Sequence, residues 1–139
     1  MGRKIFKIFV LIFFFSCSAK KEFVQEVNTL KYEIPQEYKR TALITSSTYQ
    51  IYYQVHANSY VEGLKQVKKD IVNITLEYLL KEPFLYANIS YEGKMKIRKM
   101  IEQKGKMIYF KRLSENQDLY EVVFHFTDYD LRNQLRNIK

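Results

Sequence analysis

The sequence predicts an α+β domain: a small antiparallel sheet of three or four strands, packed by one long amphipathic helix and one or two shorter helices. Three observations predict it. Residues 49–57 alternate apolar and polar side chains, which is the period of a half-buried strand. Residues 60–80 repeat apolar side chains at spacings of three and four, which is the period of an amphipathic helix. Residues 107–126 contain two apolar segments separated by a short polar turn, a pattern typical of a hairpin.

The first strand leads directly into the long helix. From Ile51 to Ala57 the odd-numbered side chains are apolar and share one face. Ser59 and Glu62 form a capping box that predicts the start of the helix, and Pro83 ends it. Its apolar stripe is Tyr60, Leu64, Val67, Ile71, Ile74 and Tyr78, widened by Val61, Val72, Thr75 and Leu79. The 4-3 spacing lasts for only three heptads, so packing on a sheet is favoured over a coiled coil.

Ser90 to Lys104 is the second predicted helix. Gly105 is expected to close it in the position after the C-cap. Gly93 weakens its first turn, and Phe84 to Tyr91 is also compatible with a short strand leading into it.

The C-terminal part predicts a hairpin followed by a short helix. The two strands are Met107 to Leu113 and Leu119 to Phe126, joined by a polar turn of five residues. Thr127 to Asp130 then precede a terminal helix. Its apolar face is formed by Leu131, Leu135 and Ile138.

Composition limits the chain to one domain with an ordinary hydrophobic core. The chain has 139 residues, of which 47% are hydrophobic, and it contains 12 tyrosines and 10 phenylalanines. Four glycines and two prolines argue against a loop-rich body. The single cysteine excludes an intrachain disulfide, so the core alone must hold the fold.

The first 17 residues have the pattern of an exported protein. A basic segment, residues 3–7, precedes an apolar run from Ile8 to Phe15 that stops at Ser16-Cys17. A basic segment, a short apolar segment and a small residue before the cut predict a signal peptide over residues 1–16. The apolar run is too short for an uncleaved anchor, which needs ~20 residues to cross the hydrocarbon core. Cleavage before Cys17 removes three cations and lowers the net charge from +8 to +5.

The sequence around Cys17 resembles the lipobox of bacterial lipoproteins, in which the cysteine is acylated and becomes the mature N-terminus. Ser16 fits this pattern, whereas Phe14 and Phe15 depart from the usual leucine and small residue. A plain secretory peptide with an incidental cysteine is the alternative. The following charges alternate in sign and Pro35 interrupts any helix, which predicts a lipidated N-terminus and tether over residues 17–42. The α+β domain then occupies residues 43–139.

The order of elements from Tyr49 to Asp130 resembles the twenty-kilodalton outer-membrane lipoprotein family, which includes flagellum-associated lipoproteins. A strand leads into a long amphipathic helix, and the stretch Leu119-Tyr120-Glu121-Val122-Val123-Phe124 lies in a late pair of strands. The chain lacks the glycines of that family's first strand, and its long helix has Val, Ile and Leu where alanines are usual. The resemblance implies a role in the cell envelope.

No motif predicts an enzyme, a cofactor or a metal site. Gly-x-Ser-x-Gly and glycine-rich phosphate loops are absent. His56 and His125 lie on predicted outward faces of two strands, but a stable metal site needs three or four ligands. Asp128 and Asp130 are explained by the start of the terminal helix.

One segment is strongly basic. Between residues 94 and 112 eight cations are opposed only by Glu102, and Tyr91, Tyr109 and Phe110 flank or interleave them. The cations are Lys94, Lys96, Arg98, Lys99, Lys104, Lys106, Lys111 and Arg112. They form a candidate surface for a polyanion, such as an anionic envelope polymer, although a solvated lysine-rich helix face is the simpler explanation of the same residues. Nucleic acid is not expected as a partner of an exported protein.

These patterns lead us to expect a lipid-anchored lipoprotein of the bacterial cell envelope that acts as a non-catalytic binding or structural module. Its partners would be the membrane, through the lipid anchor, and an anionic envelope polymer or envelope protein. Ser18 stands where an aspartate retains some lipoproteins at the inner membrane, so the outer membrane is favoured. The alternative is a soluble exported protein with a small apolar ligand in an aromatic pocket. Its lining would be Tyr52, Tyr53, Tyr109, Phe124 and Phe126.

Overall fold

The computed structural model describes residues 33–114 and 117–139, and residues 34–139 form one compact unit. A short 3₁₀ helix, η1 (Gln36–Tyr38), comes first. Four strands form one antiparallel sheet in the order β1-β2-β4-β3: β1 (Ala42–Thr45), β2 (Thr48–His56), β3 (Gly105–Arg112) and β4 (Leu119–Thr127). The helices are α2 (Tyr60–Leu80), α3 (Tyr91–Lys104) and α4 (Leu131–Arg136). The predicted α+β class, with three or four antiparallel strands, is confirmed.

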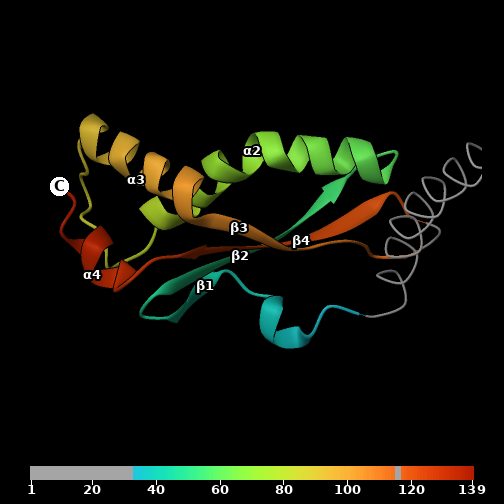
Figure 1. The fold of residues 1–139 in the computed structure, drawn as a ribbon, viewed down its shortest axis with the longest axis horizontal. Coiled ribbons are helices and arrows are strands. Elements are labelled where there is room, and N and C mark those ends of the chain that lie inside the picture. Colours follow the sequence, from blue (N-terminus) through green and yellow to red (C-terminus); the bar gives the residue numbers. More distant parts are fainter. Residues whose placement is uncertain (1–32, 115–116) are drawn as a thin grey trace, which may run out of the picture. The chain divides into compact units, whose positions relative to one another are not determined.

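The two faces of the sheet have different coverings. Helices α2 and α3 lie over one face, the helix face, whereas η1 lies beneath the other, which we call the far face (Figure 1). The hydrophobic core fills the space between the helix face and the helices, and α4 with Ile138 completes it at one end. The central strands contribute Ile51, Val122 and Phe126, which are almost fully buried.

Helix α2 begins as predicted but turns a slightly different side to the core. The Ser59 hydroxyl accepts a hydrogen bond from the Glu62 backbone N–H at 3.2 Å, which confirms the cap. The buried residues are Gly63, Val67, Ile71, Thr75 and Leu79. Val61 and Tyr78, predicted to belong to the apolar face, are 74% and 39% exposed. The core-facing stripe therefore follows the i, i+4 row and includes Thr75, whose hydroxyl donates to the Ile71 carbonyl.

Helix α3 begins one residue after the predicted start, and Ser90 is its N-cap: the Ser90 hydroxyl accepts from the Gly93 backbone N–H. The role predicted for Gly105 is wrong. Its φ of −75° and ψ of 145° are extended, so α3 continues directly into β3 without a left-handed cap. A side chain there has no room, because a Cβ would lie 2.1 Å from Phe124 Cζ and 2.6 Å from the Ile101 carbonyl oxygen. Phe84 to Tyr91, weighed as a strand, forms a loop and the first residue of α3.

Residues 34–41 belong to the compact unit, although they were predicted to lie in the tether. Ile34 is only 2% exposed, and the Gln50 side-chain amide donates to the backbone carbonyls of Glu37 and Arg40 at 3.2 and 2.8 Å. The next residues form β1, a short edge strand that the sequence analysis missed. The compact unit thus begins at Ile34 rather than at residue 43.

The hairpin and terminal helix agree with the prediction. Strands β3 and β4 pair antiparallel, with a bulge between Met107 and Tyr109. The Asp128 and Arg132 backbone N–H groups donate to the carbonyls of Ser47 and Ser46 in the turn between β1 and β2, which ties α4 to the sheet. Leu131, Leu135 and Ile138 are buried, as expected.

We expect Gly105→Ala to lower the free energy of unfolding by about 1 to 3 kcal/mol, because the new methyl group would overlap buried Phe124 and a helix carbonyl. Urea denaturation of the full chain measures this loss as a lower midpoint. Lys106→Ala, at the exposed neighbouring position, is the control and should leave the midpoint almost unchanged. An unchanged midpoint for Gly105→Ala would contradict the close approach.

Candidate functional site

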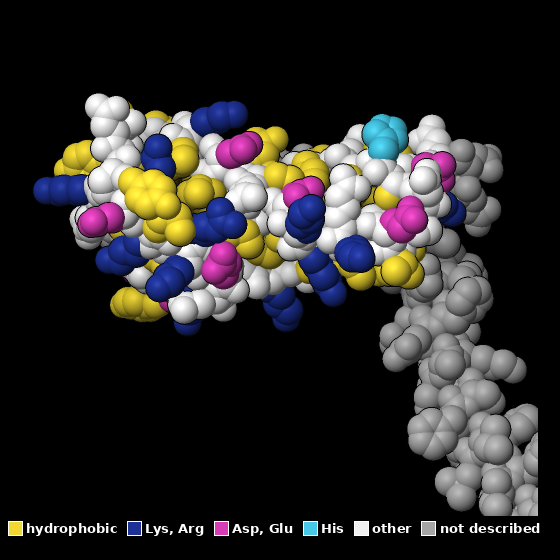
Figure 2. All heavy atoms as spheres, turned by 90° about the horizontal axis from the view of Figure 1, so that it is seen from above, with side chains coloured by type: hydrophobic (Ala, Val, Ile, Leu, Met, Phe, Trp, Pro, Cys, Tyr) yellow, Lys and Arg dark blue, Asp and Glu magenta, His cyan; other side chains and the backbone are white. Residues whose placement is uncertain are grey.

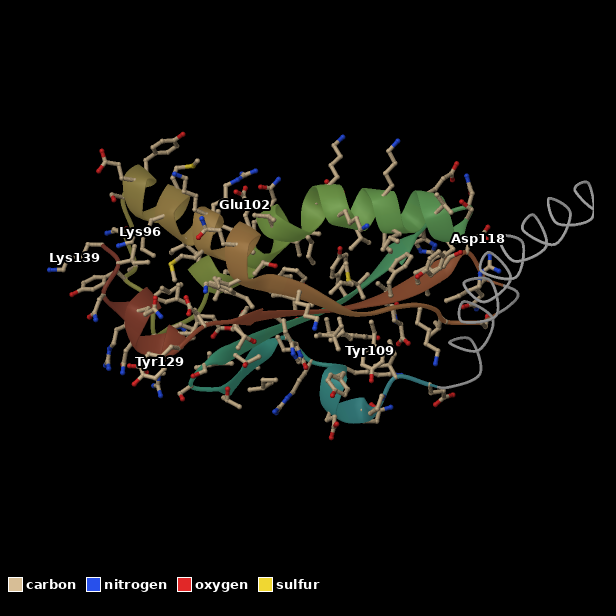
Figure 3. All side chains as sticks on the ribbon, viewed as in Figure 1. Lys96, Glu102, Tyr109, Asp118, Tyr129 and Lys139 are labelled. Carbon is tan, nitrogen blue, oxygen red and sulfur yellow. The ribbon has the colours of Figure 1, made fainter. Side chains whose placement is uncertain are left out.

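The five aromatic residues predicted to line one ligand pocket lie on opposite faces of the sheet. Tyr53, Phe124 and Phe126 face the helices and belong to the core or pack against it. Tyr52 and Tyr109 lie on the far face, where the Tyr109 ring packs edge-on against Tyr38 of η1 at 5.2 Å (Figure 3). A sheet separates the two groups, so they do not form the pocket that the alternative function requires.

The cations predicted to form one polyanion surface are also divided. Lys94, Lys96, Lys99 and Lys104 are exposed on α3. Arg98 is engaged, because its guanidinium donates to the Asn73 side-chain oxygen of α2 at 2.7 Å and contacts Glu102 at 3.4 Å. Figure 2 shows the helix side of the domain, where Lys and Arg side chains are interspersed with Asp and Glu. This face has mixed charge rather than a continuous basic patch.

The three cations of β3 point to different sides of the sheet. Lys106 and Lys111 share the far face with their cross-strand partners His125 and Glu121, and Lys111 is buried. Arg112 lies on the helix face, 5.6 Å from the Tyr120 ring centre and 3.5 Å from the Asp118 carboxylate. Because β3 is an edge strand, its cations and its bulge are typical of an edge protected against pairing with another chain.

The two histidines lie at opposite ends of the pairing between β2 and β4. His56 is opposite Leu119, whereas His125 is opposite Gln50. His125 is half-buried rather than outward-facing: its Nε2 lies 2.9 Å from the Gln50 side-chain oxygen, and its ring stacks near Tyr38. Burial lowers the pKa of His125. Within residues 33–114 and 117–139, no group of three or more His, Cys, Asp or Glu could hold a metal ion.

A buried polar cluster lies on the far face beneath residues 34–41. Glu121 is 4% exposed, and its carboxylate accepts from the Tyr52 hydroxyl at 2.7 Å. The Lys39 amine lies 3.4 Å from the same oxygen, Oε1. Burial, and secondarily the hydrogen bond to Glu121, raise the pKa of Tyr52, so it stays protonated and donates. The polar and charged groups of the cluster are paired with one another, so we assign it a role in stability.

Two adjoining hollows surround the loop between α2 and α3. One, of about 390 Å³, is lined by Phe84, Leu85, Tyr86, Ala87, Arg136 and Asn137. The other, of about 230 Å³, is lined by Leu80, Tyr86, Ala87, Asn88, Ile89 and Lys94. They share Tyr86 and Ala87, and we call them the loop hollows. Buried Leu85 and Ile89 anchor the loop in the core, whereas Tyr86 between them is 52% exposed.

The charged side chains that the structure describes at the loop hollows are cationic. Lys94 and Arg136 line them, and the Lys139 amine lies 5.9 Å from the Tyr86 ring centre. Figure 3 shows Lys139 and Lys96 at this same end of the domain. Sequence analysis identified Lys94 but missed Arg136, Tyr86 and the two asparagines. The only local sign of the site in the sequence was an aromatic and an amide residue in the predicted loop, at Tyr86-Ala87-Asn88.

Cys17 and the segment 1–32 lie outside the described residues, so the structure adds nothing to the predicted signal peptide and lipidation. Among the residues that are described, no helix is both long and apolar enough to span a bilayer. Comparison with protein-family models, curated proteins and solved structures found no match to this chain.

We expect Tyr52→Phe and Glu121→Ala to destabilise the fold by about 1 to 3 kcal/mol each, because each leaves a partner of the buried cluster unsatisfied. The double variant should lose less than the sum, with a coupling of about 1 kcal/mol in urea denaturation. Thr48→Ala, which removes a hydrogen bond at a distant point of the sheet, is the control and should be additive with Glu121→Ala. Additivity of Tyr52→Phe with Glu121→Ala would exclude the coupling.

The lowered pKa of His125 makes stability depend on pH. The unfolded chain binds a proton near the ordinary pKa of 6.5, while the folded chain resists it, so the free energy of unfolding rises with pH in the window just below 6.5. His125→Gln should flatten this part of a stability profile measured by denaturant titration. His56→Gln, which leaves His125 in place, should keep the parent slope. If His125→Gln leaves the slope of unfolding free energy against pH unchanged, the pH dependence comes from other groups.

Proposed function

We propose that this chain is a lipid-anchored lipoprotein of the bacterial cell envelope whose α+β domain acts by binding, without catalysis. The observation that carries the proposal is the order of features along the chain. A basic and apolar leader stops at Ser16-Cys17, and a compact domain begins at Ile34. Acylation of Cys17 would anchor the domain, with each buried CH₂ of the acyl chains contributing ~0.8 kcal/mol and two or more chains giving stable attachment.

The distance along the chain between Cys17 and the domain suits an anchor. Residues 18–33 separate them, and sixteen residues reach at most about 55 Å when fully extended. That length allows a domain to work clear of the lipid headgroups. Ser18 favours the outer membrane, by the analogy of lipoprotein sorting.

The covered far face directs binding to other surfaces. A partner cannot use the sheet face around Glu121 while residues 34–41 occupy it. The cations at the loop hollows, Lys94 and Arg136, remain accessible and favour an anionic envelope partner. The soluble ligand-binder gains no such support, because its five aromatic residues lie on both faces of the sheet.

Intact mass spectrometry of the chain, expressed in a bacterium and extracted from the membrane fraction, tests the anchor. We expect a mass that begins at Cys17 and includes acyl chains. Cys17→Ala should abolish acylation and move the protein to the soluble fraction, because the lipid supplies the membrane affinity. Cys17→Ser is a matched variant that should behave in the same way. An unmodified parent chain cut elsewhere would refute the lipoprotein assignment.

A further inference from the structure

We infer that the loop hollows bind an acidic oligosaccharide. The inference rests on the proposed envelope function and names the chemical class of the partner. It begins from the shape of the site. The larger hollow, about 390 Å³, reaches the range of about 300 to 1,000 Å³ that is typical of small-molecule sites. The smaller hollow continues it past Tyr86, so the pair suits more than one ring of an extended ligand.

The shared wall of the hollows is an aromatic ring that solvent can reach. Tyr86 is 52% exposed, in a loop that Leu85 and Ile89 fix to the core on either side. The face of an aromatic ring is electron-rich and attracts partly positive groups. The C–H groups on one face of a sugar ring are such groups, and a ring stacked on Tyr86 would bury them. Because the loop is already anchored, stacking would not have to order it.

The polar groups around Tyr86 are unused and complement a sugar acid. Asn88 lines one hollow and Asn137 the other, and neither side-chain amide has a hydrogen bond within the described part of the chain. Each amide offers two donors and an acceptor, which match sugar hydroxyls. Lys94 and Arg136 likewise form no ion pair with a described carboxylate. A guanidinium binds a carboxylate or phosphate group through two parallel hydrogen bonds.

Among the residues that the structure describes, no acidic side chain lines either hollow. The carboxylate of Glu82, close in sequence to the loop, accepts a hydrogen bond from the Tyr49 hydroxyl at 2.8 Å and is thereby engaged. The charge of the site therefore selects an anion. Anionic lipid headgroups have the same charge, so a bilayer surface is the competing occupant that the test below distinguishes from a saccharide. The exposed Tyr86 ring and the side-chain amides of Asn88 and Asn137 favour the saccharide chain.

The test is NMR titration of the full chain with tetragalacturonate and, separately, its methyl ester, which keeps the sugar rings and removes the charge. We expect shifts confined to the loop hollows and tighter binding of the acid. Lys94→Gln with Arg136→Gln should raise Kd at least about tenfold. Lys65→Gln with Lys68→Gln, which removes two exposed charges from α2, is the matched control and should change Kd less than about twofold. Tyr86→Ala should weaken binding, and Tyr86→Phe should preserve it.

Three results would overturn the inference. The first is no binding of tetragalacturonate or of a heparin-derived tetrasaccharide up to about 10 mM. The second is an equal loss of affinity in the control pair. The third is binding only to phosphatidylglycerol vesicles, which would make the surface a lipid contact. If the saccharides do not bind but Cys17 is acylated, the lipoprotein proposal still holds. If the saccharides bind but Cys17 is not acylated, the binding site is supported and the anchor is refuted.

Discussion

The pairing of β2 with β4 is the interaction on which the rest of the fold depends. It runs without a break from Thr48 opposite Thr127 to His56 opposite Leu119, and both faces of these strands are covered along much of their length. One face is apolar and packs under the helices. The other carries Gln50 and Glu121, which would cost free energy if they were buried without partners. Residues 34–41 provide those partners, so this segment is needed to bury the polar face of the sheet.

Elements with a strong local pattern were predictable. The cap at Ser59, the long helix, the second helix and the hairpin each depend on residues a few positions apart, and the structure has all of them. Residues 34–41 were not predictable, because the segment is short, charged and interrupted by Pro35, and because its partner Glu121 on β4 is distant in sequence. Strand β1 was missed because it has only four residues, Ala42–Thr45. Gly105 does lie at the end of α3, but glycine is required there by close packing and not by a left-handed cap. Its neighbour Phe124 belongs to another strand.

The same distinction, between local patterns and contacts between distant segments, applies to the candidate site. The eight cations from Lys94 to Arg112 are close in sequence, but a helix followed directly by an edge strand sends them to different surfaces. The loop hollows show the reverse. Lys94 and Arg136 come from segments far apart in the chain, and they line adjoining hollows because α3 and α4 both pack against the core beside the 84–89 loop. No periodicity or spacing encodes a site that tertiary packing assembles in this way.

In the proposed lipoprotein, the binding site and the anchor would lie at opposite ends of the domain. The described chain starts beneath the sheet at one end of the compact unit, and the 84–89 loop and α4 lie at the other end (Figure 1). Other surfaces are less suited to a partner: residues 34–41 cover the far face, the helix side has mixed charge, and β3 is a protected edge. Lys94, Arg136 and the side-chain amides of Asn88 and Asn137 have no partner among the described residues, and they come from α3, α4 and the loop, all of which pack on the core, so they keep their hydrogen-bonding capacity for a ligand. A domain joined to the membrane through its first residues would therefore leave this end free to bind.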